Sequence, residues 1–200
     1  ISLAMIAGIA FGPLLGGTMT HYASQEMAFY AMAAITAISL VIALRILPDI
    51  RNANVTETTG SFRQILRNVR LSSVIGFNFL AVLSRAAVFG FLSLYLSQPI
   101  TNGGMDLPIS TIGIILSAGL LVSAVLQREF GRLADRYNKR TIILTGAIIS
   151  TIGAILIPQM NHILNLLVAQ ILFYCGITMC IPAINAIVAI NGREFGEGTA

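Results

Sequence analysis

Six long apolar stretches determine what this chain of 200 residues can fold into. Each has at least the roughly 17 residues that a helix needs to cross the hydrocarbon core of a bilayer. They cover Ile1–Met19, Met27–Leu47, Leu71–Leu96, Ile109–Leu126, Thr141–Ile157 and Ile163–Ile190. These runs are too long and too uniformly apolar for the alternating strands of a membrane β-barrel. The sequence therefore predicts an all-α membrane protein with six transmembrane helices.

Composition argues against the soluble classes of protein. Charged residues make up only 10% of the chain, against about 25% in a soluble domain, and too few remain for a water-facing surface. We find no nucleophile–base constellation, metal cluster or phosphate-binding glycine loop, and therefore expect no enzyme activity, no cofactor and no metal site. Cys175 and Cys180 lie in one apolar stretch and are expected to be packing residues.

Basic residues occupy every second connection between the apolar stretches. They follow the second, fourth and sixth stretches, whereas the other three connections contain neither Lys nor Arg. This alternation is the positive-inside pattern of multi-pass proteins. It predicts that the basic loops face the cytoplasm from the cell membrane and that the first helix crosses outwards. The net charge of +4 thus indicates topology, and we expect no nucleic-acid partner.

A polar segment at 48–70 separates two helices from four. Pro48 is expected to end the second helix, because proline cannot continue the backbone hydrogen bonds. Ser61 is expected to cap a short amphipathic helix that runs to Arg70 along the cytoplasmic interface.

A glycine-rich string distinguishes the first predicted helix. Gly8, Gly12 and Gly16 recur every fourth residue and line one helix face, where a second backbone is able to approach closely. Pro13 is expected to bend the helix, and Gly17 completes the string. For the bare spacing, the alternative is a generic packing face.

A basic decapeptide, 131–140, follows the fourth apolar stretch. Gly131 is suited to end a helix. Asp135 is a single carboxylate among four cations, which are Arg132, Arg136, Lys139 and Arg140. It belongs either to a solvated turn with weak ion pairs, or to a latch on a neighbouring helix N-terminus worth about 0.3–1 kcal/mol.

Together, the two strings resemble signatures of the major facilitator superfamily (MFS) of secondary transporters. The glycine–proline string resembles the antiporter signature of the family's fifth helix, and the decapeptide resembles its loop between helices eight and nine. Residues 176–186 resemble its tenth helix less specifically. The chain is thereby identified as a fragment of a twelve-helix fold with pseudo-symmetric halves, covering helices five to ten.

This resemblance implies a division of the chain. Residues 1–47 would be the last two helices of the N-terminal half, 48–70 the central linker, and 71–200 the first four helices of the C-terminal half. Asn138 stands where the loop signature usually has glycine, and asparagine tolerates the left-handed conformation that glycine would adopt. The first predicted helix is expected to pack through its glycine face on the fourth. Asp135 is expected to dock on its N-terminal end when the cytoplasmic side is closed.

The resemblance to the drug/proton antiporter branch implies alternating access with proton-coupled efflux of a small organic solute. The bilayer, the solute and protons are the expected partners, and the complete protein is expected to be a monomer. Two alternatives stay open: a symporter that imports a sugar, organic acid or peptide, and a non-transporting membrane receptor or assembly subunit. We do not expect the chain alone to transport.

Arg85 is a basic residue in the interior of a predicted span, roughly 20 Å from either end of its helix. Burial of this charge costs at least about 2.5 kcal/mol, so the side chain is expected to face protein or a water-filled cavity. Asn78 and Phe89 share its helix face. This face is predicted to line the transport pathway, where Arg85 binds an anionic group or pairs with a proton-carrying carboxylate outside the chain. The alternative is a structural charge pair.

Polar residues also recur on the sixth predicted helix, at Gln170, Tyr174 and Thr178, with Asn185 further along. They are candidates for hydrogen bonds to a solute, and interhelical hydrogen bonds are the alternative of equal weight. The six predicted spans contain no Asp or Glu, so the acid of a proton-coupled antiporter would lie on a helix outside the chain.

Overall fold

The computed structural model describes residues 2–46 and 69–192, and all regular structure in these ranges is helical. The long helices are α1 (Ser2–Tyr22), α2 (Gln25–Ile46), α4 (Val69–Ser97), α5 (Ile109–Arg136), α6 (Lys139–Leu156) and α7 (Ile163–Gly192). The short 3-10 helices are η1 (Ile100–Asn102) and η2 (Ile157–Gln159). The predicted linker from Pro48 to residue 68, with Ser61, lies outside the described residues.

Each long helix coincides with one predicted span. Five of them, α2, α4, α5, α6 and α7, are long and apolar enough to cross a membrane. The sixth, α1, has 21 residues, which at 1.5 Å per residue gives about 31 Å. The prediction of an all-α membrane protein is therefore confirmed.

The largest boundary error concerns α5, which continues ten residues past the predicted end at Leu126. Gly131 therefore lies inside this helix and does not end it. The extension is stabilised by packing, because Ala134 is buried in a small apolar cluster with Ile142 of α6 and Ala183 of α7. The length of the apolar stretch thus predicted only the apolar part of α5 and not its polar extension.

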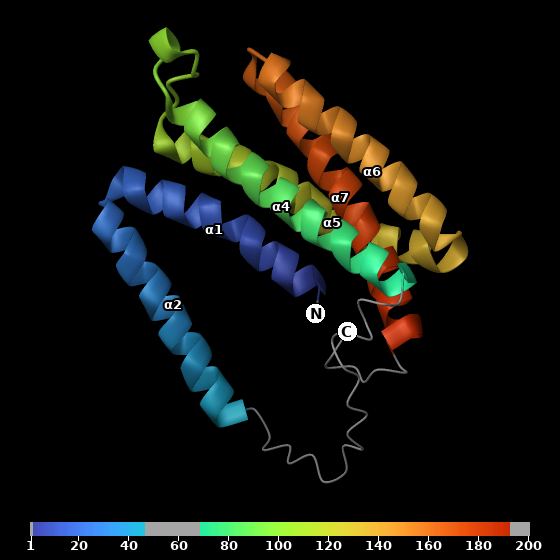
Figure 1. The fold of residues 1–200 in the computed structure, drawn as a ribbon. Helices are drawn as coiled ribbons and strands as arrows, with labels where there is room; N and C mark the ends of the chain where they lie inside the picture. Colours follow the sequence, from blue (N-terminus) through green and yellow to red (C-terminus); the bar gives the residue numbers. More distant parts are fainter. Residues whose placement is uncertain (1, 47–68, 193–200) are drawn as a thin grey trace.

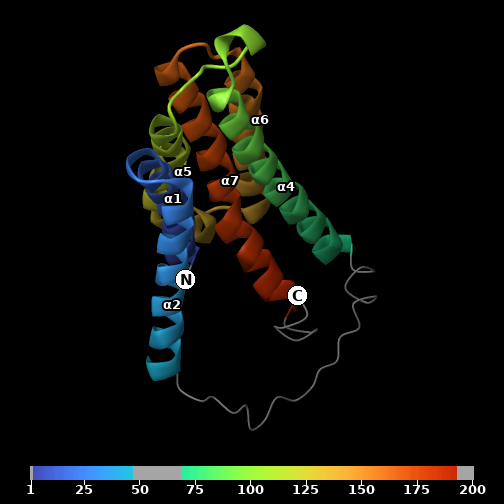
Figure 2. The same cartoon turned by 90° about the vertical axis from the view of Figure 1, so that its left-hand side faces the viewer.

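Helices α5 and α7 form the centre of the bundle (Figure 1). Helix α1 packs along α5, α6 packs along α7, and α4 contacts both α7 and α5. Half of the most apolar part of α5 is buried, against 6% for α2. In both views α2 extends away from the α4–α7 bundle, and its main contact is with α1 (Figures 1 and 2).

Glycines set the distance between α1 and α5. A Cβ atom at Gly17 would lie 2.8 Å from the carbonyl oxygen of Ile109 and 3.1 Å from the Cα of Gly113. A Cβ at Gly113 would in turn clash with the carbonyl oxygen of Pro13. The fully buried Ala10 lies further along α1. The predicted pairing of the first and fourth membrane helices is confirmed, with the two backbones in direct contact.

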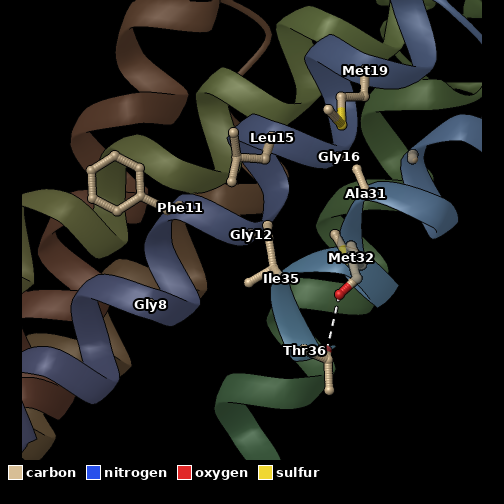
Figure 3. Close-up of a pocket in the computed structure, with 11 residues that line it drawn as sticks. Gly8, Phe11, Gly12, Leu15, Gly16, Met19, Ala31, Met32, Ile35 and Thr36 are labelled. Carbon is tan, nitrogen blue, oxygen red and sulfur yellow. Dashed lines mark hydrogen bonds between the residues drawn. The ribbon is translucent and has the colours of Figure 1, made fainter. Parts of the chain in front are cut away.

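The predicted contact face on α1 is wrong. A Cβ at Gly8 or Gly12 would meet no described atom within 4 Å, and these residues line a groove of about 390 Å³ between α1 and α2 together with Gly16 (Figure 3). Gly17 is the position where a partner glycine allows the closest approach, so the row through Pro13 and Gly17 faces α5. The row through Gly8, Gly12 and Gly16 is left on the flank.

Glycines also allow the backbones of α6 and α7 to approach closely. A Cβ at Gly146 would lie 2.6 Å from both the carbonyl oxygen of Gly176 and the sulfur of Cys180. A Cβ at Gly153 would lie 2.5 Å from the backbone nitrogen of Phe173. Cys180 is buried at this contact, which agrees with its prediction as a packing residue.

Glycines at the α1–α5 contact and glycines on the free flank of α1 should respond differently to a methyl group. We expect Gly113→Ala and Gly17→Ala to lower the free energy of unfolding by about 1–3 kcal/mol, because the added Cβ overlaps backbone atoms. Gly8→Ala and Gly12→Ala are the matched controls and should change it by less than about 0.5 kcal/mol. SDS titration of the complete protein in micelles measures all four variants. Equal tolerance of Gly113→Ala and Gly8→Ala would contradict the packing described here.

Candidate functional site

Arg85 of α4 and Tyr174 of α7 form the centre of a polar cluster inside the bundle. Val88 and Phe89, which follow Arg85 within about one turn of α4, pack against the apolar core that contains Tyr174. Tyr174 is 1% exposed, and Arg85 is half-buried. The Nε atom of Arg85 is enclosed, whereas its two terminal nitrogens are not, and none of the three has a hydrogen-bond partner among the described residues.

Gln170 lies one helical turn before Tyr174 and is fully buried. Its side-chain nitrogen donates a hydrogen bond of 3.3 Å to the carbonyl oxygen of Leu116 on α5. The sequence left two roles open for Gln170, a hydrogen bond to a solute or one between helices, and this bond is of the second kind. It also fixes the amide, so that the side-chain oxygen remains without a partner in the described part of the chain.

Gly119 of α5 makes room for these two side chains. A Cβ at this position would lie 2.8 Å from the Cδ2 of Tyr174 and 3.2 Å from the Cγ of Gln170. Any larger residue would force the tyrosine ring out of its present place. Sequence reasoning missed Gly119, although a glycine inside a helix costs up to about 1 kcal/mol and is a signal of close packing.

Five buried side-chain atoms within residues 2–46 and 69–192 have no hydrogen-bond partner. They are Arg85 Nε, Ser117 Oγ, Gln127 Oε1, Gln170 Oε1 and the Tyr174 hydroxyl oxygen. An unsatisfied buried group costs about 1–3 kcal/mol, so native interiors contain few of them. Three of the five belong to the cluster of Arg85, Gln170 and Tyr174. Ser117 and Gln127, both on α5, were not predicted as site residues.

The other predicted pathway residues lie around or beyond this cluster. Thr178 is buried one turn after Tyr174, and Phe89 packs against the main apolar core, to which Tyr174 belongs. Asn78 and Asn185 are exposed. Asn78 is seven residues from Arg85 and Asn185 is eleven from Tyr174, which along a helix amounts to about 10 and 16 Å. The structure thus concentrates the candidate site on Arg85, Gln170 and Tyr174.

The cytoplasmic decapeptide forms a tight connection between two helices. Helix α5 ends at Arg136, and the N–H of Tyr137 still donates to the carbonyl oxygen of Leu133. Asn138 then caps α6, because its side-chain oxygen accepts a 3.0 Å hydrogen bond from the N–H of Arg140. Its φ of −61° is not left-handed, so the left-handed conformation expected for Asn138 is wrong. The residue caps a helix instead.

Most charges of the decapeptide are exposed. Arg132 forms an ion pair with Glu129 at 2.9 Å, one turn away on the same helix, which at such exposure contributes little stability. Asp135, Arg136 and Arg140 are exposed and Lys139 is half-buried. Asp135 forms no ion pair with any residue that the structure describes. The latch predicted for Asp135 stays a prediction.

Residues 1–200 match the sequence model of the Major Facilitator Superfamily. The chain belongs to this superfamily. It is therefore a multi-pass membrane protein from a family of transporters and not an enzyme.

Curated relatives agree with this assignment. An uncharacterised MFS-type transporter of Methanocaldococcus jannaschii, MJ1560, is 24% identical over 98% of the chain and 51% of its own length. A multi-drug resistance efflux pump PmrA homolog of Lactococcus lactis is 23% identical over 94% of the chain and 47% of its own length. The MFS-type transporter YuxJ of Bacillus subtilis is 24% identical over 99% of the chain and 51% of its own length. The chain spans about half the length of these relatives.

The cap at Asn138 gives a local prediction. Asn138→Ala removes the side-chain acceptor and should destabilise the first turn of α6 by about 1 kcal/mol. Hydrogen exchange at the amide of Arg140 should accordingly become about fivefold faster. Asn138→Asp keeps an acceptor at the helix N-terminus and should exchange as the parent protein does. Mass-spectrometric hydrogen exchange on the complete protein measures both. Unchanged exchange in Asn138→Ala would contradict the cap.

Proposed function

We propose that the complete protein is a secondary transporter that moves a small organic solute by alternating access, through proton-coupled efflux. The observation that carries the proposal is the cluster of Arg85, Gln170 and Tyr174, whose buried polar atoms find no partner among residues 2–46 and 69–192 although they lie within membrane-spanning helices. Such residues inside membrane segments face a pathway or a partner. The efflux direction is supported by the glycine–proline string of α1 and by the relative named as an efflux pump.

The proposed organisation follows the family's two halves. Residues 1–47 belong to the N-terminal half, 48–70 to the linker and 71–200 to the C-terminal half, with the basic loops in the cytoplasm. In this arrangement the contact of α1 with α5 joins the two halves. Its closest point pairs the C-terminal part of α1, at Gly17, with the first turns of α5, at Ile109 and Gly113. These ends face outwards in the proposed orientation, so the outer side is the closed one.

The exposed Asp135 is consistent with an open cytoplasmic side. In the proposed cycle, its carboxylate docks on the N-terminal end of α1 when that side closes. The positive end of a helix dipole stabilises a nearby anion, so such a contact favours the closed state modestly without locking it.

Transport is tested in proteoliposomes that contain the complete protein and an imposed proton gradient. We expect at least one of two dyes, anionic carboxyfluorescein or cationic ethidium, to accumulate against the proton flow, and a protonophore to abolish this accumulation. Arg85→Ala should lower the rate at least about tenfold, a loss of about 1.4 kcal/mol in transition-state stabilisation, and Arg85→Lys should retain part of it. Arg45→Gln, at the end of α2, is the control.

Three outcomes would contradict parts of this proposal. Movement of a dye in the same direction as the protons would favour symport. No gradient-driven movement of either dye would contradict the efflux function. Undiminished transport in both Arg85 variants, at equal amounts of protein, would remove Arg85 from the pathway.

The Asp135 latch is tested by the distance between the cytoplasmic ends of α1 and α5. Spin labels at the exposed positions Met5 and Tyr137, in a background without Cys175 and Cys180, report that distance. Asp135→Asn should reduce the ratio of the closed to the open population about two- to fivefold, as expected from 0.3–1 kcal/mol.

Glu129→Gln removes a carboxylate from the same helix and should leave that ratio unchanged. An unaltered distance distribution in Asp135→Asn would exclude the latch.

A further inference from the structure

The charge of Arg85 is not neutralised within the described part of the chain. Acidic residues there are Glu26, Asp106, Glu129 and Asp135. Glu26 and Asp135 lie in terminal turns of helices, Asp106 lies in a loop, and Glu129 lies in the last two turns of α5. The one ion pair within the described ranges joins Glu129 to Arg132. Arg85, in contrast, lies in the interior of α4. An isolated cation at this depth needs an anionic partner or water.

The guanidinium of Arg85 is arranged to receive such a partner. Its Nε is enclosed by protein, which fixes the plane of the group, whereas the two terminal nitrogens remain accessible and unbonded to any described residue. Two terminal N–H groups in one plane match the two oxygens of a carboxylate, and this bidentate geometry is specific to arginine.

Tyr174 of α7 supplies a second donor, in addition to the two terminal N–H groups of Arg85. Its hydroxyl group is buried and has no hydrogen-bond partner within residues 2–46 and 69–192. The tyrosine belongs to the apolar core against which Phe89, one turn after Arg85 on α4, packs. A hydroxyl group that is free to turn can donate its hydrogen to a carboxylate. The positive charge of Arg85 is what favours an anion over a cation at this place. Gln170 is held by its bond to Leu116, and its unpartnered side-chain oxygen suits a hydroxyl or N–H group elsewhere on the same solute.

We propose that Arg85 and Tyr174 bind the carboxylate of the transported solute, which makes the substrate an organic anion. This inference rests on the transport function proposed above and assigns a substrate class to the same site. The carboxylate has a second possible source, an acidic side chain on a helix outside the chain. An occupied internal pair leaves no place for an added carboxylate, so a binding experiment separates the two sources.

The experiment measures thermal unfolding of the complete protein in detergent, with a thiol-reactive dye that reports exposure of the buried Cys180. The probes are benzoate and butyrate, each at about 10 mM, compared with benzamide and butyramide of the same shape. We expect each carboxylate to raise the unfolding midpoint by about 2 °C or more and the amides to leave it unchanged.

Variants assign the effect to the site. Arg85→Gln should abolish the difference between carboxylate and amide, and Tyr174→Phe should weaken carboxylate binding about threefold or more. Arg128→Gln removes an exposed cation near the cytoplasmic end of α5 and should behave as the parent protein does. If Arg85→Gln fails to fold, Tyr174→Phe provides the decisive variant, because it removes only a hydroxyl group that has no partner in the described ranges.

Stabilisation by the amides equal to that by the carboxylates, or no stabilisation of the parent protein, would each overturn the anion site. The last result would assign the carboxylate to a helix outside the chain. Binding in detergent needs no gradient, so this outcome is distinct from a failure of transport. Carboxylate binding without proton-driven movement would keep the anion site and refute the efflux function.

Discussion

Direct contact between helix backbones at glycines is the constraint on which the rest of this structure depends. Inside a bilayer, an apolar side chain gains little by exchanging lipid for protein, so helices associate through close packing and polar contacts. Gly17 meets Gly113 between α1 and α5, and Gly146 meets Gly176 between α6 and α7. These contacts hold α5 and α7 at the centre of the bundle and thereby fix what their facing side chains can touch.

The polar cluster is a consequence of that packing. Gly119 leaves room for Tyr174 and Gln170 between α5 and α7, and the part of α4 that follows Arg85 packs against the core to which Tyr174 belongs. A tightly packed interior normally satisfies its polar atoms, because each unsatisfied one destabilises the fold. Here the close approach of the helices gains packing while hydroxyl and amide oxygens stay unpaired. The stability lost at these atoms is what a bound solute would restore, which links the packing of the helices to the proposed transport.

The sequence predicted the helices and their order well, because apolar length is a property of each segment itself. It did not predict which face of α1 meets α5, because a spacing of four defines a face but not its neighbour. The spacing pointed to Gly8 and Gly12, whereas the contact depends on a glycine of α5 opposite Gly17. Asn138 was misread for a related reason. A two-residue connection places a helix end and a helix start side by side, and the asparagine serves the start of α6.

The two ends of the α1–α5 pair differ in physical character, and the difference bears on how a transporter would switch. The end at Gly17 and Gly113 is a contact of backbone atoms. The opposite end of α5 carries exposed charges, among them Asp135 and Arg136, whose interactions are weak and screened by salt. The pair thus has packed backbone atoms at one end and exposed, adjustable charges at the other. In the proposed orientation the adjustable end faces the cytoplasm, where the binding of solute and protons would be able to shift the balance between the two states.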